Sequence, residues 1–298
     1  MFNIGPLQFN QPIALAPMED VSDIPFRQIC KEHGADIVYT EFTNCEALSR
    51  NVKHSIEKIQ ITEKERPVAI QLYGSNGDSL EKAAAIAEEL APDFIDINVG
   101  CPVKKVVKRN GGSGCLRDLD LVETLVRAVD DATSLPTTVK IRSGFDERTR
   151  DPVTIGLRCQ DAGARALCIH PRTRADMYSG EARWDEIRAV TEALDIPVIG
   201  PGRASFMMAL IFANKMSVVT QWDGWIPLYK KTAQEYGMND RLASVRSINV
   251  MPDVANLLGG KEEVVFPKLV ACAMQCIEED GAEVILLGST TMHQAHSH

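Results

Sequence analysis

The sequence predicts an α/β fold, a (β/α)8 barrel of the TIM type followed by a short, atypical α/β extension. Short apolar runs alternate along the chain with amphipathic stretches of helical periodicity, as in successive βαβ units. Eight such runs fit the number of strands in a barrel of this kind. Polar or reactive residues follow most of the runs directly, where a barrel carries its active site. An open doubly wound sheet stays possible, because strand counting does not distinguish the two.

The elements follow from this alternation in chain order. Strands are expected at residues 12–18, 36–42, 68–74, 94–100, 137–144, 166–172, 197–202 and 216–221. Helices are expected between them at 79–90, 119–132 and 184–194, with 225–236 as the last barrel helix. Beyond it, residues 242–250, 265–281 and 282–288 predict a strand, a helix and a strand. We therefore expect a barrel domain at 1–238 and an extension at 239–298.

Composition and charge narrow the class of protein. The chain has 298 residues, of which 45% are apolar and 24% charged, as in an ordinary globular protein. No run approaches the roughly 18 apolar residues of a membrane span, and the start, MFNIGPLQFNQP, does not resemble a secretory signal. A net charge of −9 argues against broad nucleic-acid binding but permits a local basic patch. A soluble, cytoplasmic protein is expected, and the sequence predicts no oligomeric state.

Eight cysteines are scattered along the chain, and none forms a CxxC pair. Neither a zinc ribbon nor a redox pair is indicated, and free thiols suit a reducing compartment. Cys272 and Cys276 lie one helical turn apart, but most of these cysteines are expected to be small buried residues. The sequence therefore predicts no metal site.

The ends of the expected strands carry the candidate functional residues. Alternation along 137–144 places Lys140 and Arg142 on the same side of their strand. Any one such residue has an ordinary structural explanation, whereas the repetition at successive strands favours a shared site. The set comprises Pro17, Met18, Glu41, Gln71, Asn98, Cys101, Lys140, Arg142, His170 and Arg172.

Four stretches in this order resemble the signatures of the tRNA-dihydrouridine synthases. They are APMEDVSDIPFR (16–27), NVGCPVKKVVKRNGGSG (98–114), KIRSG (140–144) and HPRTRADMYSGEARWDEI (170–187). The resemblance covers residues 1–200. It implies a flavin-containing (β/α)8 barrel followed by a helical domain, and reduction of uridine to 5,6-dihydrouridine in tRNA by FMN, with NADPH as the reductant.

The resemblance also implies roles for individual residues. Cys101 would give a proton to uracil C5, because a thiol with a pKa of about 8.5 is protonated at neutral pH; its alternative is a buried structural thiol. Residues expected at the flavin are Ala16, Pro17, Met18, Gln71, Lys140 and His170. Residues expected at the extruded base or the RNA backbone are Asn98, Lys104, Lys105, Arg142 and Arg172. We expect Lys104 and Lys105 to face phosphate and not the sulfur.

The resemblance ends after residue 200. The family's Asn-Gly-Asp loop is replaced by Pro201, Gly202 and Arg203, and its Gly-Arg-Gly loop is absent. Gly202 and Arg203 are the remaining candidates to contact the FMN phosphate. The rest resembles the Asp/Glu/hydantoin racemase family, so the chain resembles two families joined near Pro-Val-Ile-Gly, as in a natural or engineered fusion.

Three hypotheses follow from this junction. The first is a flavin-dependent reductase of tRNA uridine, with tRNA binding weakened by the altered C-terminal part. The second is a fusion with an incomplete flavin site and no activity. The third is a racemase, which the sequence disfavours because Ser289 stands where a cysteine acid or base is expected.

Overall fold

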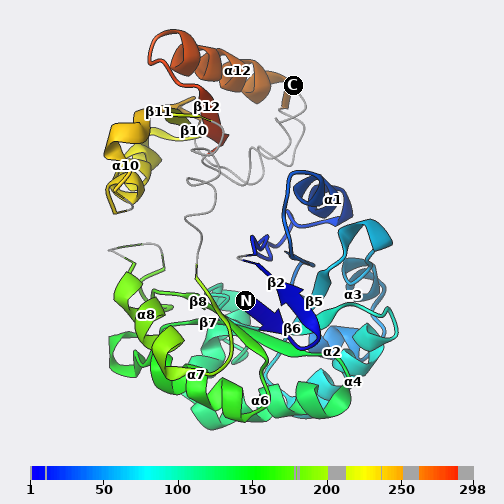
Figure 1. Ribbon diagram of the computed structural model, residues 1–298. Helices are drawn as coiled ribbons and strands as arrows, with labels where there is room; N and C mark the ends of the chain where they lie inside the picture. The colour runs from blue at the N-terminus through cyan, green and yellow to red at the C-terminus, as the bar shows by residue number, and fades with distance from the viewer. Residues whose placement is uncertain are drawn as a thin grey trace. The chain divides into compact units, whose positions relative to one another are not determined.

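The computed structural model describes residues 2–10, 12–177, 179, 182–200, 213–235, 237–250 and 262–287. The chain divides into two compact units, residues 1–201 and residues 202–298 (Figure 1). Each unit is described by itself. The first unit holds most of the candidate functional residues.

A seven-stranded parallel sheet forms the centre of the first unit. Its main path runs through β3 (Val38–Tyr39), β5 (Val68–Tyr73), β6 (Phe94–Val99), β7 (Thr137–Arg142), β8 (Ala166–His170) and β9 (Val198–Ile199), and β4 (Thr43–Asn44) pairs with β5. A separate antiparallel hairpin, β1 (Phe2–Ile4) and β2 (Leu7–Phe9), precedes it.

Helices follow the strands and cover one side of this sheet (Figure 1). The longer ones are α4 (Gly77–Glu88), α6 (Leu119–Ala132), α7 (Pro152–Asp161) and α8 (Trp184–Ala193), and α1 is Ile24–Glu32. Shorter elements are α2 (Cys45–Leu48), α3 (Lys53–Lys58), α5 (Lys104–Val107), and the 3-10 turns η1 (Glu63–Glu65), η2 (Gly112–Arg117) and η3 (Glu147–Thr149). Asn76, Asp118 and Asp151 begin α4, α6 and α7, each accepting a hydrogen bond from the first turn.

The central strands alternate between an apolar and a polar face. Ile70, Ile95, Ile97, Val139 and Leu167 belong to one buried core cluster together with apolar residues of α4, α6 and α7. The residues that alternate with them lie on the opposite face, since successive strand side chains point to opposite sides. On that face Ala69, Phe94 and Ala166 belong to a second apolar cluster, and polar residues occupy the positions further along the strands. The helices therefore bury one face of the sheet and leave the other for polar groups.

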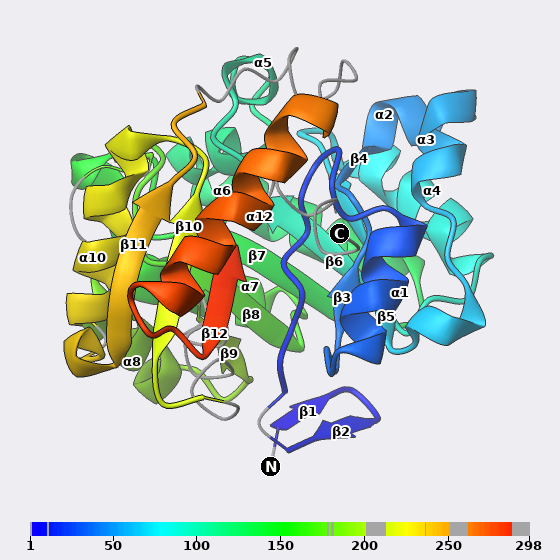
Figure 2. The ribbon, with the colours of Figure 1, turned by 90° about the horizontal axis from the view of Figure 1, so that it is seen from above.

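The second unit contains a three-stranded parallel sheet in the order β11 (Leu242–Ser247), β10 (Met216–Thr220), β12 (Val284–Leu287). Helix α12 (Glu262–Glu278) packs across its strands and α10 (Ile226–Glu235) packs against β11 (Figure 2). The turns η4 (Asp223–Trp225) and η5 (Asn239–Arg241) flank α10. The elements expected at 216–221, 225–236, 242–250, 265–281 and 282–288 are thus confirmed.

The predicted α/β class with a parallel, curled sheet is confirmed, but two details differ. The expected strand at 12–18 is reduced to a single bridge between Ala14 and Ile37. The expected eighth strand, β10, pairs with β11 and β12, and in the described part of the chain β9 does not pair with β3. The chain divides into its two compact units after Pro201, and the domain boundary expected at 238 stays a prediction.

The first unit also buries an ion pair that its stability should depend on. Arg27 Nε donates to Glu65 at 2.6 Å, and both side chains are almost fully buried. Its other nitrogens donate to the carbonyls of Ser22 and Gln60. Removing one member leaves a buried charge without its partner.

We expect Arg27→Met to lower the free energy of unfolding by about 3 to 5 kcal/mol. Lys53→Met is the matched control, because Lys53 forms an ion pair with Glu57 on the surface, where its side chain is 91% exposed. Urea denaturation followed by circular dichroism measures both. Equal midpoints for the two variants would contradict the role assigned to the buried pair.

Candidate functional site

Polar side chains form three rows across the inner face of the sheet. The strand register aligns Gln71 with Asp96 and Asp96 with Thr138. One step further, Asn98 lies beside Lys140, and Lys140 beside Cys168. The last row pairs Arg142 with His170. Sequence reasoning selected five of these residues, and the register brings them together.

The carboxylate of Asp96 is the centre of the first row. It is buried and accepts hydrogen bonds from Gln71 Nε2 at 2.5 Å and from Thr138 Oγ1 at 2.5 Å. Burial raises the pKa of Asp96 to about 6, while the two hydrogen bonds and the charge of Lys140 lower it. The group therefore changes charge close to physiological pH.

A chain of hydrogen bonds links Asp96 to Cys101. Asn98 Nδ2 donates to Gln71 Oε1 at 2.9 Å. The other end of the Asn98 amide, Oδ1, accepts from the backbone N–H of Gly100 at 3.0 Å and of Cys101 at 2.8 Å. The start of the loop that follows β6 is thus fixed by a side chain of the strand itself.

The far side of Cys101 is held by the glycine-rich part of the same loop. Its carbonyl accepts hydrogen bonds from the Ser113 backbone N–H at 3.1 Å and from Ser113 Oγ at 2.8 Å. Gly112 has a φ of +53°, and a Cβ at this position would lie 2.9 Å from the Cys101 Cβ. Only glycine fits here without moving the cysteine.

Cys101 is buried, with 8% of the residue exposed. Burial raises its pKa above the usual range, and the negative charge of Glu19 adds to this. The cations that oppose the shift are Arg142 and Lys140. This arrangement suits a group that donates a proton.

Lys140 and His170 form the charged part of the site. The positive charge of Lys140 lowers the pKa of Asp96, Cys168 and His170, so its ammonium lies near all three. Burial, followed by the charges of Arg142, Lys140 and Arg172, lowers the pKa of His170 to about 3. His170 is consequently a neutral imidazole at neutral pH, able to donate or accept a hydrogen bond without adding charge.

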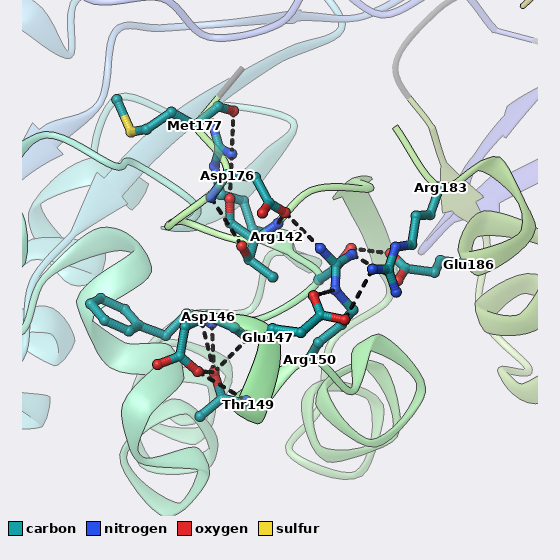
Figure 3. A network of polar contacts seen from close by, with 12 residues as sticks. Arg142, Asp146, Glu147, Thr149, Arg150, Asp176, Met177, Arg183 and Glu186 are labelled. Carbon is teal, nitrogen blue, oxygen red and sulfur yellow. Dashed lines mark hydrogen bonds and ion pairs between the residues drawn. The ribbon is translucent and has the colours of Figure 1, made fainter. Parts of the chain in front are cut away.

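Arg142 acts as a brace between loops. It is 2% exposed, and its Nε donates to the carbonyl of Gly100 at 3.0 Å. Its Nη1 donates to the carbonyls of Thr173 and Met177, both at 3.0 Å (Figure 3). These bonds join the loop after β6, which carries Cys101, to the loop after β8.

Arg150 joins the loops after β7 and β8 through ion pairs. Its guanidinium bonds Glu147 at 2.7 Å, Asp176 at 2.6 Å and Glu186 at 2.9 Å, three carboxylates from three segments (Figure 3). Asp176 also accepts from the backbone N–H of Thr173. The loops after β7 and β8 are therefore fixed relative to α8.

The remaining predicted site residues lie around this centre. Ala16, Pro17 and Met18 follow the bridge at Ala14, and the Met18 backbone is closed by Ser22. Lys104 and Lys105 are exposed on α5. The backbone of Arg172 donates to the His170 carbonyl and accepts from Ser143. Gly202 and Arg203 lie outside the described residues, as does Ser289.

Sequence reasoning missed Asp96, Thr138 and Cys168. A signal for Asp96 was present, because a carboxylate two residues before Asn98 shares its face of the strand. Glu19 was also missed, although it lies within the quoted stretch at 16–27.

Two other kinds of feature, a metal-binding cluster and a membrane-spanning helix, are absent from the described ranges. These ranges contain no cluster of three or more histidine, cysteine or acidic residues placed to hold a metal ion. Among the helices that the structure describes, none combines the length and the hydropathy needed to cross a bilayer.

Comparison with known proteins gives two family matches. Residues 14–209 match the family model described as dihydrouridine synthase, and residues 184–298 match the one described as Asp/Glu/hydantoin racemase. The tRNA-dihydrouridine synthase B of Pseudomonas aeruginosa is 40% identical over 199 residues, which is 67% of this chain and 60% of that protein. A probable tRNA-dihydrouridine synthase of Rickettsia prowazekii is 38% identical over 203 residues, 68% of this chain and 62% of that protein.

The chain thus spans about 60% of the length of the curated relatives that it matches. Among solved structures, an allantoin racemase from Klebsiella pneumoniae matches 77% of each chain at 20% identity with a TM-score of 0.37, too low a similarity to bear on the fold.

We expect His170 to stay neutral from pH 8 down to pH 5. Because its folded-state pKa lies below the reference value of about 6.5, the unfolded chain binds a proton first as the pH falls. Its contribution to stability is therefore lost between pH 6.5 and 3. Histidine 15N spectra, assigned with His170→Asn, measure the midpoint, and the variant should lose less stability over this pH window. A midpoint above pH 6 would refute the assignment.

Proposed function

We propose that this chain, which belongs to the dihydrouridine synthase family over residues 14–209, reduces uridine in tRNA to 5,6-dihydrouridine. The observation that carries the proposal is a buried thiol, Cys101, whose backbone N–H is held by Asn98, a residue on the same sheet face as Lys140 and His170. Relatives named tRNA-dihydrouridine synthase support the substrate class.

The polar face fits the ring of a flavin. Lys140 supplies a fixed positive charge, which suits the ring edge where negative charge collects on reduction. His170 supplies a neutral hydrogen-bonding group beside it, and Gln71 supplies an amide. When bound, FMN supplies the hydride for C6 of uracil, with NADPH as its reductant. Ala16, Pro17 and Met18 would form the apolar wall against the ring.

The FMN phosphate would bind apart from the residues proposed to contact the ring. Gly202 and Arg203 are proposed to contact it, since they replace the loop that holds phosphate in the family. A single phosphate loop in place of two predicts weaker retention of FMN than in longer relatives.

The chain's own chemistry is the delivery of one proton. The Cys101 thiol gives its proton to C5 of the uracil as the hydride arrives at C6, and leaves a thiolate. Lys140 and Arg142, which oppose the rise in the thiol's pKa, stabilise that thiolate. Asn98 orients the thiol through the backbone, and Asn98 and Arg172 are proposed to contact the extruded base.

Exposed cations around the site are proposed to hold the RNA backbone. Lys104, Lys105, Lys108 and Arg109 are exposed in the loop after Cys101. Arg117 and Arg174 both lie over the Phe145 ring, 4.0 and 5.5 Å from its centroid. The described part of the second unit is an α/β structure and not an all-helical domain, so we propose that tRNA affinity is lower than in the curated relatives.

Cys101→Ala should retain FMN but reduce formation of dihydrouridine by about 10²- to 10⁴-fold, the usual contribution of a positioned general acid. Cys30→Ala, which changes a half-buried thiol on α1, is the matched control. Dihydrouridine in tRNA is quantified by mass spectrometry, and flavin content by absorbance near 450 nm. Parental activity in Cys101→Ala would refute the acid assignment.

A further inference from the structure

A cavity of about 300 Å³ opens beside the proposed catalytic residues without including them. None of Gln71, Asn98, Cys101, Lys140 or His170 lines it. Its volume is at the lower end of the range for small-molecule sites, which suits one nucleoside-sized group. The cavity lies wholly within the first unit.

The walls of the cavity are aromatic on one side and aliphatic on another. Phe42 and Tyr73 meet edge to face, with ring centroids 5.0 Å apart. Val103 and Val106, from the segment around α5, also line the cavity, and Val103 is 52% exposed. A flat ring can stack on such an aromatic surface, and an exposed valine gains from being covered.

Positive charge lines the cavity in and just after α5. Lys105, on α5, and Arg109, in the turn that follows it, are among the lining residues, whereas Lys104 and Lys108 are not. Lys105 and Arg109 are both exposed and can reach a phosphate at the mouth of the cavity.

Two carboxylates, which can accept hydrogen bonds, also line the cavity. They belong to Glu19 and Glu46. Lys58 pairs with Glu19 and thereby fixes its position. Carboxylates accept hydrogen bonds from the ring N–H and amino groups of a base, so the cavity offers a stacking surface, base acceptors and phosphate donors together.

We propose that this cavity is a second nucleotide subsite, in which the base lies against Tyr73 and the phosphate contacts Lys105 and Arg109. Two sources supply this chemistry: the nucleotide next to the target uridine, or the adenylate part of the reductant. That the cavity binds a nucleotide is inferred from its lining residues. That the nucleotide comes from tRNA or from the reductant rests on the proposed function.

The test compares two double variants with the same change in charge. Binding of 5′-GMP to the full chain is measured by saturation-transfer NMR. Lys105→Gln with Arg109→Gln should weaken binding about tenfold, because two phosphate contacts are lost. Lys104→Gln with Lys108→Gln removes equal charge from the same segment at two residues that do not line the cavity, and should change the affinity less than about twofold. Equal weakening in both pairs would overturn the subsite, as would an absence of 5′-GMP binding.

The aromatic wall is tested separately at Tyr73. Tyr73→Leu should lower the saturation received by the base protons, while Tyr73→Phe, which keeps the ring, should preserve it. Unchanged saturation in Tyr73→Leu would overturn the placement of the base.

Two further arms distinguish the sources. A higher affinity for the dinucleotide UpG than for 5′-UMP, lost in the Lys105 and Arg109 variant, would assign the cavity to RNA. Competition between NADP⁺ and 5′-GMP would assign it to the reductant. If neither occurs, the subsite has no part in the reaction and the proposal fails. Because Cys101→Ala should bind 5′-GMP normally, failure of the subsite and failure of the proposed function are separate results.

Discussion

The buried carboxylate of Asp96 is the constraint on which the candidate site depends. A carboxylate inside a sheet needs donors, and Gln71 and Thr138 from the neighbouring strands supply them. Once Gln71 is committed to Asp96, its oxygen is directed to Asn98, and Asn98 in turn fixes the backbone of Cys101. The position of a thiol on a loop is thus determined by hydrogen bonds that run from β6 to the neighbouring strand β5 and back. Loops carry reactive groups well when a rigid element positions them in this way.

The sequence predicts local structure well and pairing less well. Helix α6 has the expected bounds of 119–132, because its apolar period and its cap at Asp118 are local signals. The strand at 216–221 is also correct, but its partners are β11 and β12, which no pattern within the strand reveals. In the site, alternation places Lys140 and Arg142 on one face as expected, yet packing determines that Arg142 is taken up by backbone carbonyls. Asp96 was not predicted as a site residue, because one carboxylate hardly changes the apolar pattern of the strand at 94–100.

The two family matches overlap at residues 184–209, which include α8 and β9. The compact units divide within this overlap, after Pro201. The junction between the families and the junction between the units therefore coincide. In the second unit, Cys272 and Cys276 are buried, and burial raises the pKa of Cys272 to about 11. Both side chains pack in the buried apolar cluster of the second unit.

In the loop from Cys101 to Arg117, the residues that position the thiol are different from the residues proposed to contact RNA. The residues that position the thiol are buried: Ser113 donates a hydrogen bond to the Cys101 carbonyl, and Gly112 packs closely against the Cys101 side chain. The lysines of the loop are exposed, and none of these contacts depends on them. Selection can consequently remodel the outer charges to suit different RNA surfaces while the reacting sulfur stays where it is. Because Gly112 packs so closely against Cys101, a residue larger than glycine does not fit at position 112. This loop should therefore tolerate substitutions at its exposed positions and almost none at position 112.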